Sequence, residues 1–254
     1  MDDAATIAGK IETDLRLHAD AERAAGQKRY LKSDLTFLGA TVGDVRKVTA
    51  TALRHAGVTH HDEVTALVDA LWDSPVFERR LAAAVTLERK ADLLDRHDLV
   101  QLKRLVGESG TWALVDVLAV NVVGRLAVRT AIVDDLDQWA RDSDFWVRRT
   151  SLLAEIRPLK TGLPFAPFAD RADLMLDEKE FFIRKAIGWV LREASKTRPG
   201  DVFGWLAPRT ARASGVTVRE AVKYLGEPQR ALIMSAYRDG RPAVHQPGAA
   251  PTPP

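Results

Sequence analysis

The sequence contains no cysteine, and this absence excludes several kinds of protein and chemistry. Disulfide-stapled folds, zinc fingers and thiol catalysis all depend on cysteine. The six histidines offer no substitute, because none forms an H-x3-H or H-E-x-x-H pair that would place two imidazoles on one helical face. We therefore expect no metal site and no cofactor.

Long apolar runs and strand-like patterns are also scarce. No stretch approaches 18 apolar residues, and the start, Met1-Asp2-Asp3, lacks the basic and apolar regions of a secretory signal. Apolar residues instead recur at spacings of three and four, the helical period, and Pro, Gly, Asp and Ser mark the breaks. We expect an all-α protein that stays in the cytoplasm.

The net charge of +2 is small, but its distribution is uneven. Between Arg184 and Arg230 the chain carries ten Lys or Arg residues and four acidic residues, an excess of +6. Such an excess fits a surface that binds a polyanion, and it equally fits a solvated helical face.

A repeat becomes visible when the starts of successive helices are aligned. An aromatic residue, a spacer and two basic residues recur from positions 77, 146 and 182, and Trp112 and Thr217 fall in the same phase. Positions 77, 112, 146, 182 and 217 are separated by 35, 34, 36 and 35 residues. This period suits one helical hairpin per repeat, as in a HEAT-like solenoid whose stacked hairpins form a concave groove. Basic residues that share one phase of the repeat would line that groove as a basic track. Each of them could also be an ordinary surface charge. The members of this track are Arg79, Arg148, Arg149, Arg184, Lys185 and Arg219.

The two ends of the chain differ from this repeat. Residues around Tyr30 and Phe37 precede the regular hairpins and are expected to cap the array. We assign residues 1–238 to one repeat domain, and residues 239–254 to a disordered tail because they are rich in Pro and Gly.

Three side chains are candidates for chemistry. Trp112 and Asp116 are four residues apart, so on a helix they share one face. Asp116 lies in an otherwise apolar stretch where an unpaired buried charge is costly, so it is expected to face the groove, although an ordinary solvated face is the alternative. Trp189 is either a core residue or a second aromatic group of the site.

Several motifs resemble one family, the AlkD-type DNA alkylation repair glycosylases. Residues 180–193, EFFIRKAIGWVLRE, resemble its signature E-F-F-I-x-K-A-I-G-W-x-L-R-E. Residues 112–116 match its W-x-x-x-D motif, 146–149 its W-x-x-R motif and 219–223 its R-E-A-x-K motif, and the similarity runs from about residue 28 to 225. Thr41 departs from the pattern, because some members carry a longer polar residue near this position.

The resemblance implies a site and a reaction. Asp116 would be the catalytic carboxylate, Trp112 and Trp189 the aromatic pair, and Arg149 a phosphate clamp, with Tyr30 approaching from the cap. The expected activity is hydrolysis of the N-glycosidic bond of N3- or N7-alkylated purines in double-stranded DNA, by a nucleoid-associated monomer that does not flip the base into a pocket. The alternative is a HEAT-like scaffold that binds DNA or protein without catalysis.

Overall fold

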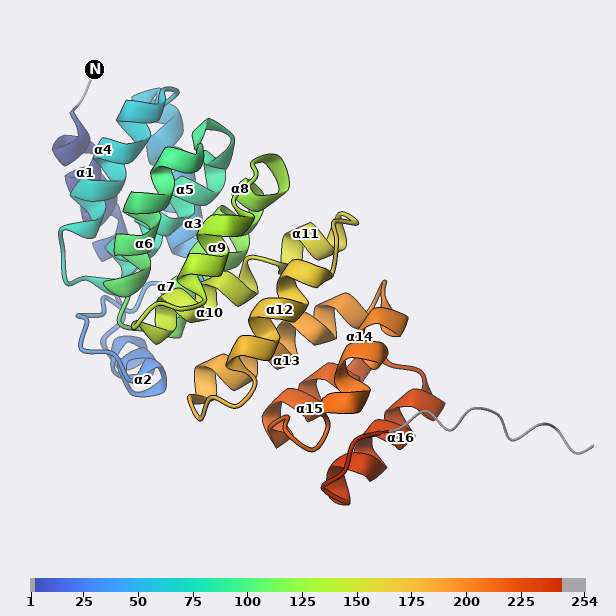
Figure 1. Ribbon diagram of the computed structural model, residues 1–254. Helices are drawn as coiled ribbons and strands as arrows, with labels where there is room; N and C mark the ends of the chain where they lie inside the picture. The colour runs from blue at the N-terminus through green and yellow to red at the C-terminus, as the bar shows by residue number, and fades with distance from the viewer. Residues whose placement is uncertain (1–2, 244–254) are drawn as a thin grey trace, which may run out of the picture. The chain divides into compact units, whose positions relative to one another are not determined.

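The computed structural model describes residues 3–243, and helices make up almost all of its regular structure (Figure 1). Over these residues the backbone forms no β-strand, and the only β-type pairing is an isolated bridge between Thr36 and Val76. In the same range no helix combines the length and apolar character needed to cross a membrane. The predicted all-α class is confirmed.

The chain divides into two compact units, residues 1–150 and 151–254, and the division falls within helix α10, Phe145–Leu153. The sequence analysis treated residues 1–238 as one domain. The helices of the first unit before α10 are α1 Ala4–Arg16, α2 Ala21–Leu31, α3 Val42–Ala56, α4 His61–Trp72, α5 Phe77–Arg89, α6 Leu99–Gly107, α7 Trp112–Val117, α8 Gly124–Arg129 and α9 Val133–Trp139. Those of the second unit are α11 Ile156–Lys160, α12 Ala166–Met175, α13 Phe181–Ser195, α14 Pro199–Leu206, α15 Gly215–Ala221 and α16 Glu227–Arg238.

The helix boundaries follow the predicted repeat. Helices α5, α7, α10, α13 and α15 begin within two residues of positions 77, 112, 146, 182 and 217. Helix α3 begins at Val42, about one repeat earlier, so the periodic part starts closer to the N-terminus than the sequence analysis assumed. Thr41 is the N-cap of α3: its hydroxyl accepts from the Asp44 N–H, and the Asp44 carboxylate accepts from the Thr41 N–H. A short polar side chain at position 41 therefore has a capping role.

Polar side chains connect equivalent positions of neighbouring repeats. A residue of one hairpin commonly meets a partner one repeat further along the chain. Within each unit these pairs include Asp69–Arg104 at 35 residues, Asp116–Arg149 at 33, Asp173–Arg209 at 36, Asp177–Arg212 at 35 and Lys185–Glu220 at 35. The helical-hairpin repeat is thus present in the contacts as well as in the sequence.

Helix α13 illustrates how the pattern produces the core. Ile183, Ile187 and Leu191 recur every four residues and are fully buried. Each such side chain stabilises the fold by roughly 1.5–3 kcal/mol relative to an exposed position. The opposite stripe of the same helix carries Lys185 and Arg192, which remain partly exposed. The amphipathic period therefore fixes which side of α13 faces outward.

The described part of the chain continues five residues beyond the predicted domain end, residue 238. After α16 the chain turns at Gly240, with φ of 63°. The Ala243 N–H then donates to the Ala207 carbonyl at 2.8 Å, and Ala243 is buried. Residues 239–243 thus pack on the second unit, and the rest of the predicted disordered tail, 244–254, lies outside the described residues.

Candidate active site

Helix α7 positions Trp112 and Asp116 one turn apart. The hydroxyl of Thr111 caps its N-terminus by accepting from the Ala113 N–H. After Val117 the chain continues without a break through a π-helical segment, residues 118–123, into α8. A π-helical turn is a rare distortion that often lies at functional sites, and here it begins two residues after Asp116, the residue predicted to be catalytic.

Arg149 of α10 holds the carboxylate of Asp116 with two parallel hydrogen bonds. Arg149 Nε donates to Asp116 Oδ1 at 2.9 Å, and Nη2 donates to Oδ2 at 3.0 Å. The Arg149 side chain is 3% exposed and that of Asp116 is 16% exposed. This bidentate geometry is the strongest form of carboxylate–guanidinium contact, and it fixes the plane of the carboxylate.

The alternative considered for Asp116, an ordinary solvated face, does not describe its surroundings in the structure. Most of the carboxylate is buried, and the guanidinium of Arg149 supplies the compensating charge. Burial raises the pKa of Asp116 above its ordinary value, while the charge and hydrogen bonds of Arg149 act in the opposite direction without cancelling the effect. The carboxylate is therefore both desolvated and firmly oriented.

Tyr30 reaches the same face from α2. Its ring meets the Trp112 ring edge to face, with centroids 5.8 Å apart and an interplanar angle of 82°. Tyr30 is 73% exposed and Trp112 is half-buried. The first unit thus brings together four of the predicted site residues: Tyr30, Trp112, Asp116 and Arg149.

A buried glutamate that the sequence analysis missed anchors the segment after α2. The Glu78 carboxylate is fully buried and accepts from the backbone N–H groups of Leu38, at 3.0 Å, and Gly39, at 2.7 Å. Gly39 has a φ of +85°, and a Cβ there would lie 2.1 Å from the Asp20 carbonyl oxygen, so this position requires glycine. The available signal was an acidic residue directly after Phe77, at the start of a predicted core helix.

Besides Arg149, the other two members of the predicted basic track in the first unit also have intramolecular partners. Arg79 is not part of an open track: it donates to Glu12 Oε2 and to the Ala70 carbonyl, both at 2.6 Å, and is 16% exposed. Its helix turns this position inward, toward α1. Arg148 is half-buried and donates to the backbone carbonyls of Asp142 and Ser143.

The other predicted residues belong to the second unit. Trp189 is half-buried, so it is not an enclosed core residue like Trp205, which is 6% exposed. Arg184 donates to the Glu178 carbonyl, Lys185 forms an ion pair with Glu220, and Arg219 is exposed. Across residues 3–243 no three His, Cys, Asp or Glu side chains converge as a metal site would require.

Comparisons with known proteins agree with this architecture. Residues 11–225 match the family model described as DNA alkylation repair enzyme. The fold is similar to that of a predicted DNA alkylation repair enzyme from Enterococcus faecalis, with a TM-score of 0.73, 22% identity, and coverage of 83% of this chain and 98% of the other. No curated protein matches the chain significantly.

Two structures from Streptococcus mutans are also similar. AlkD2 gives a TM-score of 0.61 at 16% identity over 87% of this chain and 99% of its own. The protein smu.31 gives 0.55 at 18% identity over 73% of this chain and 98% of its own. These likenesses show the fold, and the family model covers most of the sequence. The chain therefore belongs to the DNA alkylation repair enzyme family.

Proposed function

We propose that this protein is a DNA glycosylase that hydrolyses the N-glycosidic bond of N3- or N7-alkylated purines in duplex DNA. The observation that carries the proposal is the Asp116 carboxylate, desolvated and held in the plane of the Arg149 guanidinium, one helical turn from Trp112. As a member of a DNA repair family, the protein is proposed to act as a monomer on the nucleoid in the cytoplasm.

The chemistry needs only one carboxylate. Alkylation at N3 or N7 makes the purine cationic, so the base can leave without the general acid that most glycoside hydrolysis requires. The deoxyribose then gains oxocarbenium character, and a fixed negative charge nearby stabilises this state. Asp116 is proposed to supply that charge and to orient the attacking water.

The aromatic groups suit the same transition state. An indole face attracts a cationic or polarised C–H group by about 0.5–2 kcal/mol, depending on desolvation. Tyr30 supports Trp112 edge-on, which restricts the orientation of the indole. From the family pattern, Trp189 is proposed as the second indole. Because these groups act on the sugar, the base need not be flipped into a pocket.

Arg149 is proposed to position Asp116. A guanidinium that is 3% exposed and bound to both carboxylate oxygens is poorly placed to grip a phosphate unless its side chain leaves this pair. Backbone contacts are assigned instead to the more exposed cations Arg148, Arg184, Lys185 and Arg219. Such contacts give affinity without sequence preference.

The test is single-turnover release of 7-methylguanine and 3-methyladenine from duplex DNA by Asp116→Asn. We expect the rate to fall by at least about 100-fold, the scale seen when one electrostatic group is removed from an active site. Affinity for undamaged duplex should change little, because Asp116 contacts no phosphate in this mechanism.

A second variant separates catalysis from folding, since Asp116→Asn removes the negative charge that the buried Arg149 guanidinium contacts. The double variant Asp116→Asn/Arg149→Met removes both charges and should regain stability while remaining inactive. Excision at the wild-type rate by the double variant would contradict the mechanism. If the wild-type protein binds duplex DNA but releases neither base, the non-catalytic scaffold is the correct alternative.

A further inference from the structure

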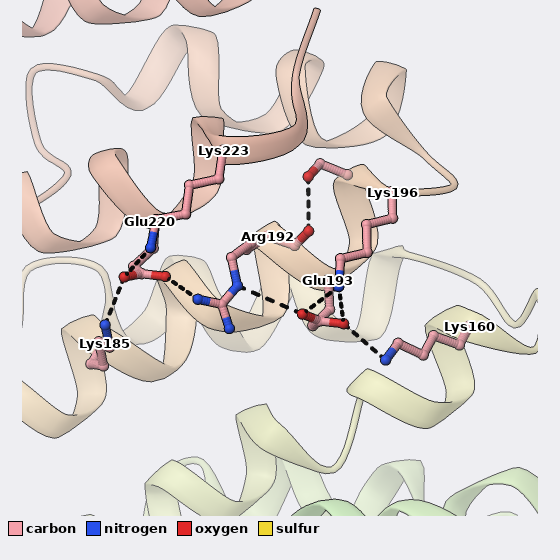
Figure 2. A network of polar contacts seen from close by, with 8 residues as sticks. Lys160, Lys185, Arg192, Glu193, Lys196, Glu220 and Lys223 are labelled. Carbon is pink, nitrogen blue, oxygen red and sulfur yellow. Dashed lines mark hydrogen bonds and ion pairs between the residues drawn. The ribbon is translucent and has the colours of Figure 1, made fainter.

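In the second unit, a network of seven charged side chains connects α11 and α13 with the end of α15 and the 3-10 turn after it, residues 222–224 (Figure 2). Glu220 accepts from three cations: Lys185 Nζ at 2.7 Å, Arg192 Nη1 at 2.6 Å and Lys223 Nζ at 2.9 Å. Glu193 accepts from Lys160 Nζ and Lys196 Nζ, each at 2.9 Å, and Arg192 Nε lies 3.6 Å from it. Arg192 therefore joins the two carboxylates into one network.

The carboxylates and the cations of this network differ in exposure. Glu193 and Glu220 are 11% and 10% exposed, whereas the lysines are 37–49% exposed. Five cations surround two carboxylates, which leaves a net charge of +3. The acidic groups thus lie beneath a layer of cations, and the surface that meets solvent is positive.

A glycine of the family signature allows this arrangement. A Cβ on Gly188 would lie 2.8 Å from Glu220 Cβ and 3.1 Å from the Thr217 backbone. Helices α13 and α15 therefore approach closely only because position 188 lacks a side chain. The Thr217 hydroxyl also donates to the Arg184 carbonyl at 3.0 Å, and this close packing brings Glu220 between Lys185 and Arg192.

The cations share a helical stripe with Trp189. Positions 185, 189, 192 and 196 follow the helical period, so Trp189 lies between Lys185 and Arg192 on one face of α13. Lys196 Nζ lies 4.8 Å from the ring centroid of Tyr224, which adds an aromatic group at the end of the stripe.

We propose that Glu193 and Glu220 are positioning residues that hold these five cations as a preformed binding site for the DNA phosphodiester backbone beside Trp189. This inference depends on the proposed function, because it assumes that duplex DNA is the ligand.

The physical argument is preorganisation. A free lysine loses side-chain freedom when it binds a phosphate, and a lysine already held by a carboxylate has lost much of it before binding. Each ammonium has three donors, so it can keep its bond to the glutamate and still donate to a phosphate. One cation is enough to neutralise each carboxylate, so charge balance within the fold does not account for a net excess of +3.

The experiment compares Glu220→Gln with Asp177→Asn in the full-length protein. Both variants raise the net charge by one, and Asp177 pairs with Arg212 in the same unit, outside the network. Affinity for undamaged duplex DNA is measured by fluorescence anisotropy over a range of salt concentrations. General electrostatics predicts tighter binding for both variants.

Positioning predicts that Glu220→Gln binds about five- to tenfold more weakly than the wild-type protein, with a smaller salt dependence, because the cations are no longer ordered. Asp177→Asn should bind as tightly as the wild-type protein or slightly more tightly. Equal or tighter binding by Glu220→Gln, with unchanged salt dependence, would overturn the proposal.

A second comparison keeps the proposal testable if Glu220→Gln fails to fold. Lys223→Ala removes one exposed cation of the network and should lower the salt slope by about 0.9, the value for one lost phosphate contact. Arg212→Ala is the matched control and should leave the slope unchanged. Equal slopes for both variants would overturn the proposal, whereas a wild-type protein that fails to bind duplex DNA at low salt would instead contradict the proposed function.

Discussion

The two units use buried carboxylates in opposite ways. In the first unit, Asp116 meets one guanidinium, Arg149, and the pair is electrically neutral. In the second unit, Glu220 meets Lys185, Arg192 and Lys223 and belongs to a network with excess positive charge. The two buried carboxylates, Asp116 and Glu220, therefore differ in the number of cations that contact them.

This difference reverses the direction of the pKa shifts. Burial raises the pKa of Asp116, and one guanidinium does not overcome the effect. Burial acts on Glu220 in the same direction, but the hydrogen bonds from Lys185 and Lys223 and the charges of Lys185 and Arg192 outweigh it and lower its pKa to about 2. The carboxylate proposed to be catalytic and the one proposed to position cations thus follow from the same physics with different partners.

The largest expected effect comes from breaking the neutral pair. Arg149→Met leaves Asp116 buried without a partner and should lower the free energy of unfolding by about 3–5 kcal/mol at pH 7. Without Arg149 the folded-state pKa of Asp116 rises further above its unfolded value, so the loss should shrink as pH falls toward about 4, where the carboxyl is protonated in the unfolded state as well as in the folded state. Urea unfolding at several pH values measures both effects.

Arg148→Met is the control for this prediction. Arg148 donates to the backbone carbonyls of Asp142 and Ser143, and its charge helps to lower the pKa of the Asp142 carboxyl. Its loss should therefore cost about 1 kcal/mol and depend on pH in the opposite direction, shrinking only as Asp142 is protonated below its ordinary pKa. Equal losses for the two variants at every pH would contradict the assigned role of Arg149.

The opposite pH dependence is expected for Glu220. Because its pKa is lowered from 4.5 to about 2, its contribution is fully present above about pH 4.5 and is lost as pH falls toward 2. The shift corresponds to at most about 3 kcal/mol, because solvent screens the partly exposed cations. Urea unfolding should show Glu220→Gln less stable than the wild-type protein at pH 6, with the two converging at pH 2–3. A constant difference over this range would show that the ion pairs are not responsible.

A smaller effect is expected from the glycine that brings α13 and α15 together. Gly188→Ala forces a Cβ against Glu220 and Thr217 and should cost about 1–3 kcal/mol, as overpacking usually does. Gly204→Ala in α14 is the matched control, since no atom lies within 4 Å of a Cβ there. That variant should gain about 0.5–1 kcal/mol from helix propensity, and thermal unfolding should show opposite signs for the two substitutions.

The part of the candidate site that could be predicted is the part that a short-range sequence pattern encodes. Trp112 and Asp116 were found together because a spacing of four residues on a helix needs no knowledge of other helices. Glu78 and Glu193 were missed, because an acidic residue looks the same in the sequence whether it is solvated or buried against partners far along the chain. Arg79 was misassigned to an open track for the same reason: only the packing of α1 shows that Glu12 binds it.

The sequence by itself determined the helical period, the repeat of about 35 residues and the family, because each depends on residue types at short or regular spacings. Only the tertiary structure decided which charges meet. The pairing of Asp116 with Arg149, and the position of Glu220 among three cations, depend on how closely helices one repeat apart approach. That distance is set by packing details such as the missing side chain at Gly188, which no local pattern encodes.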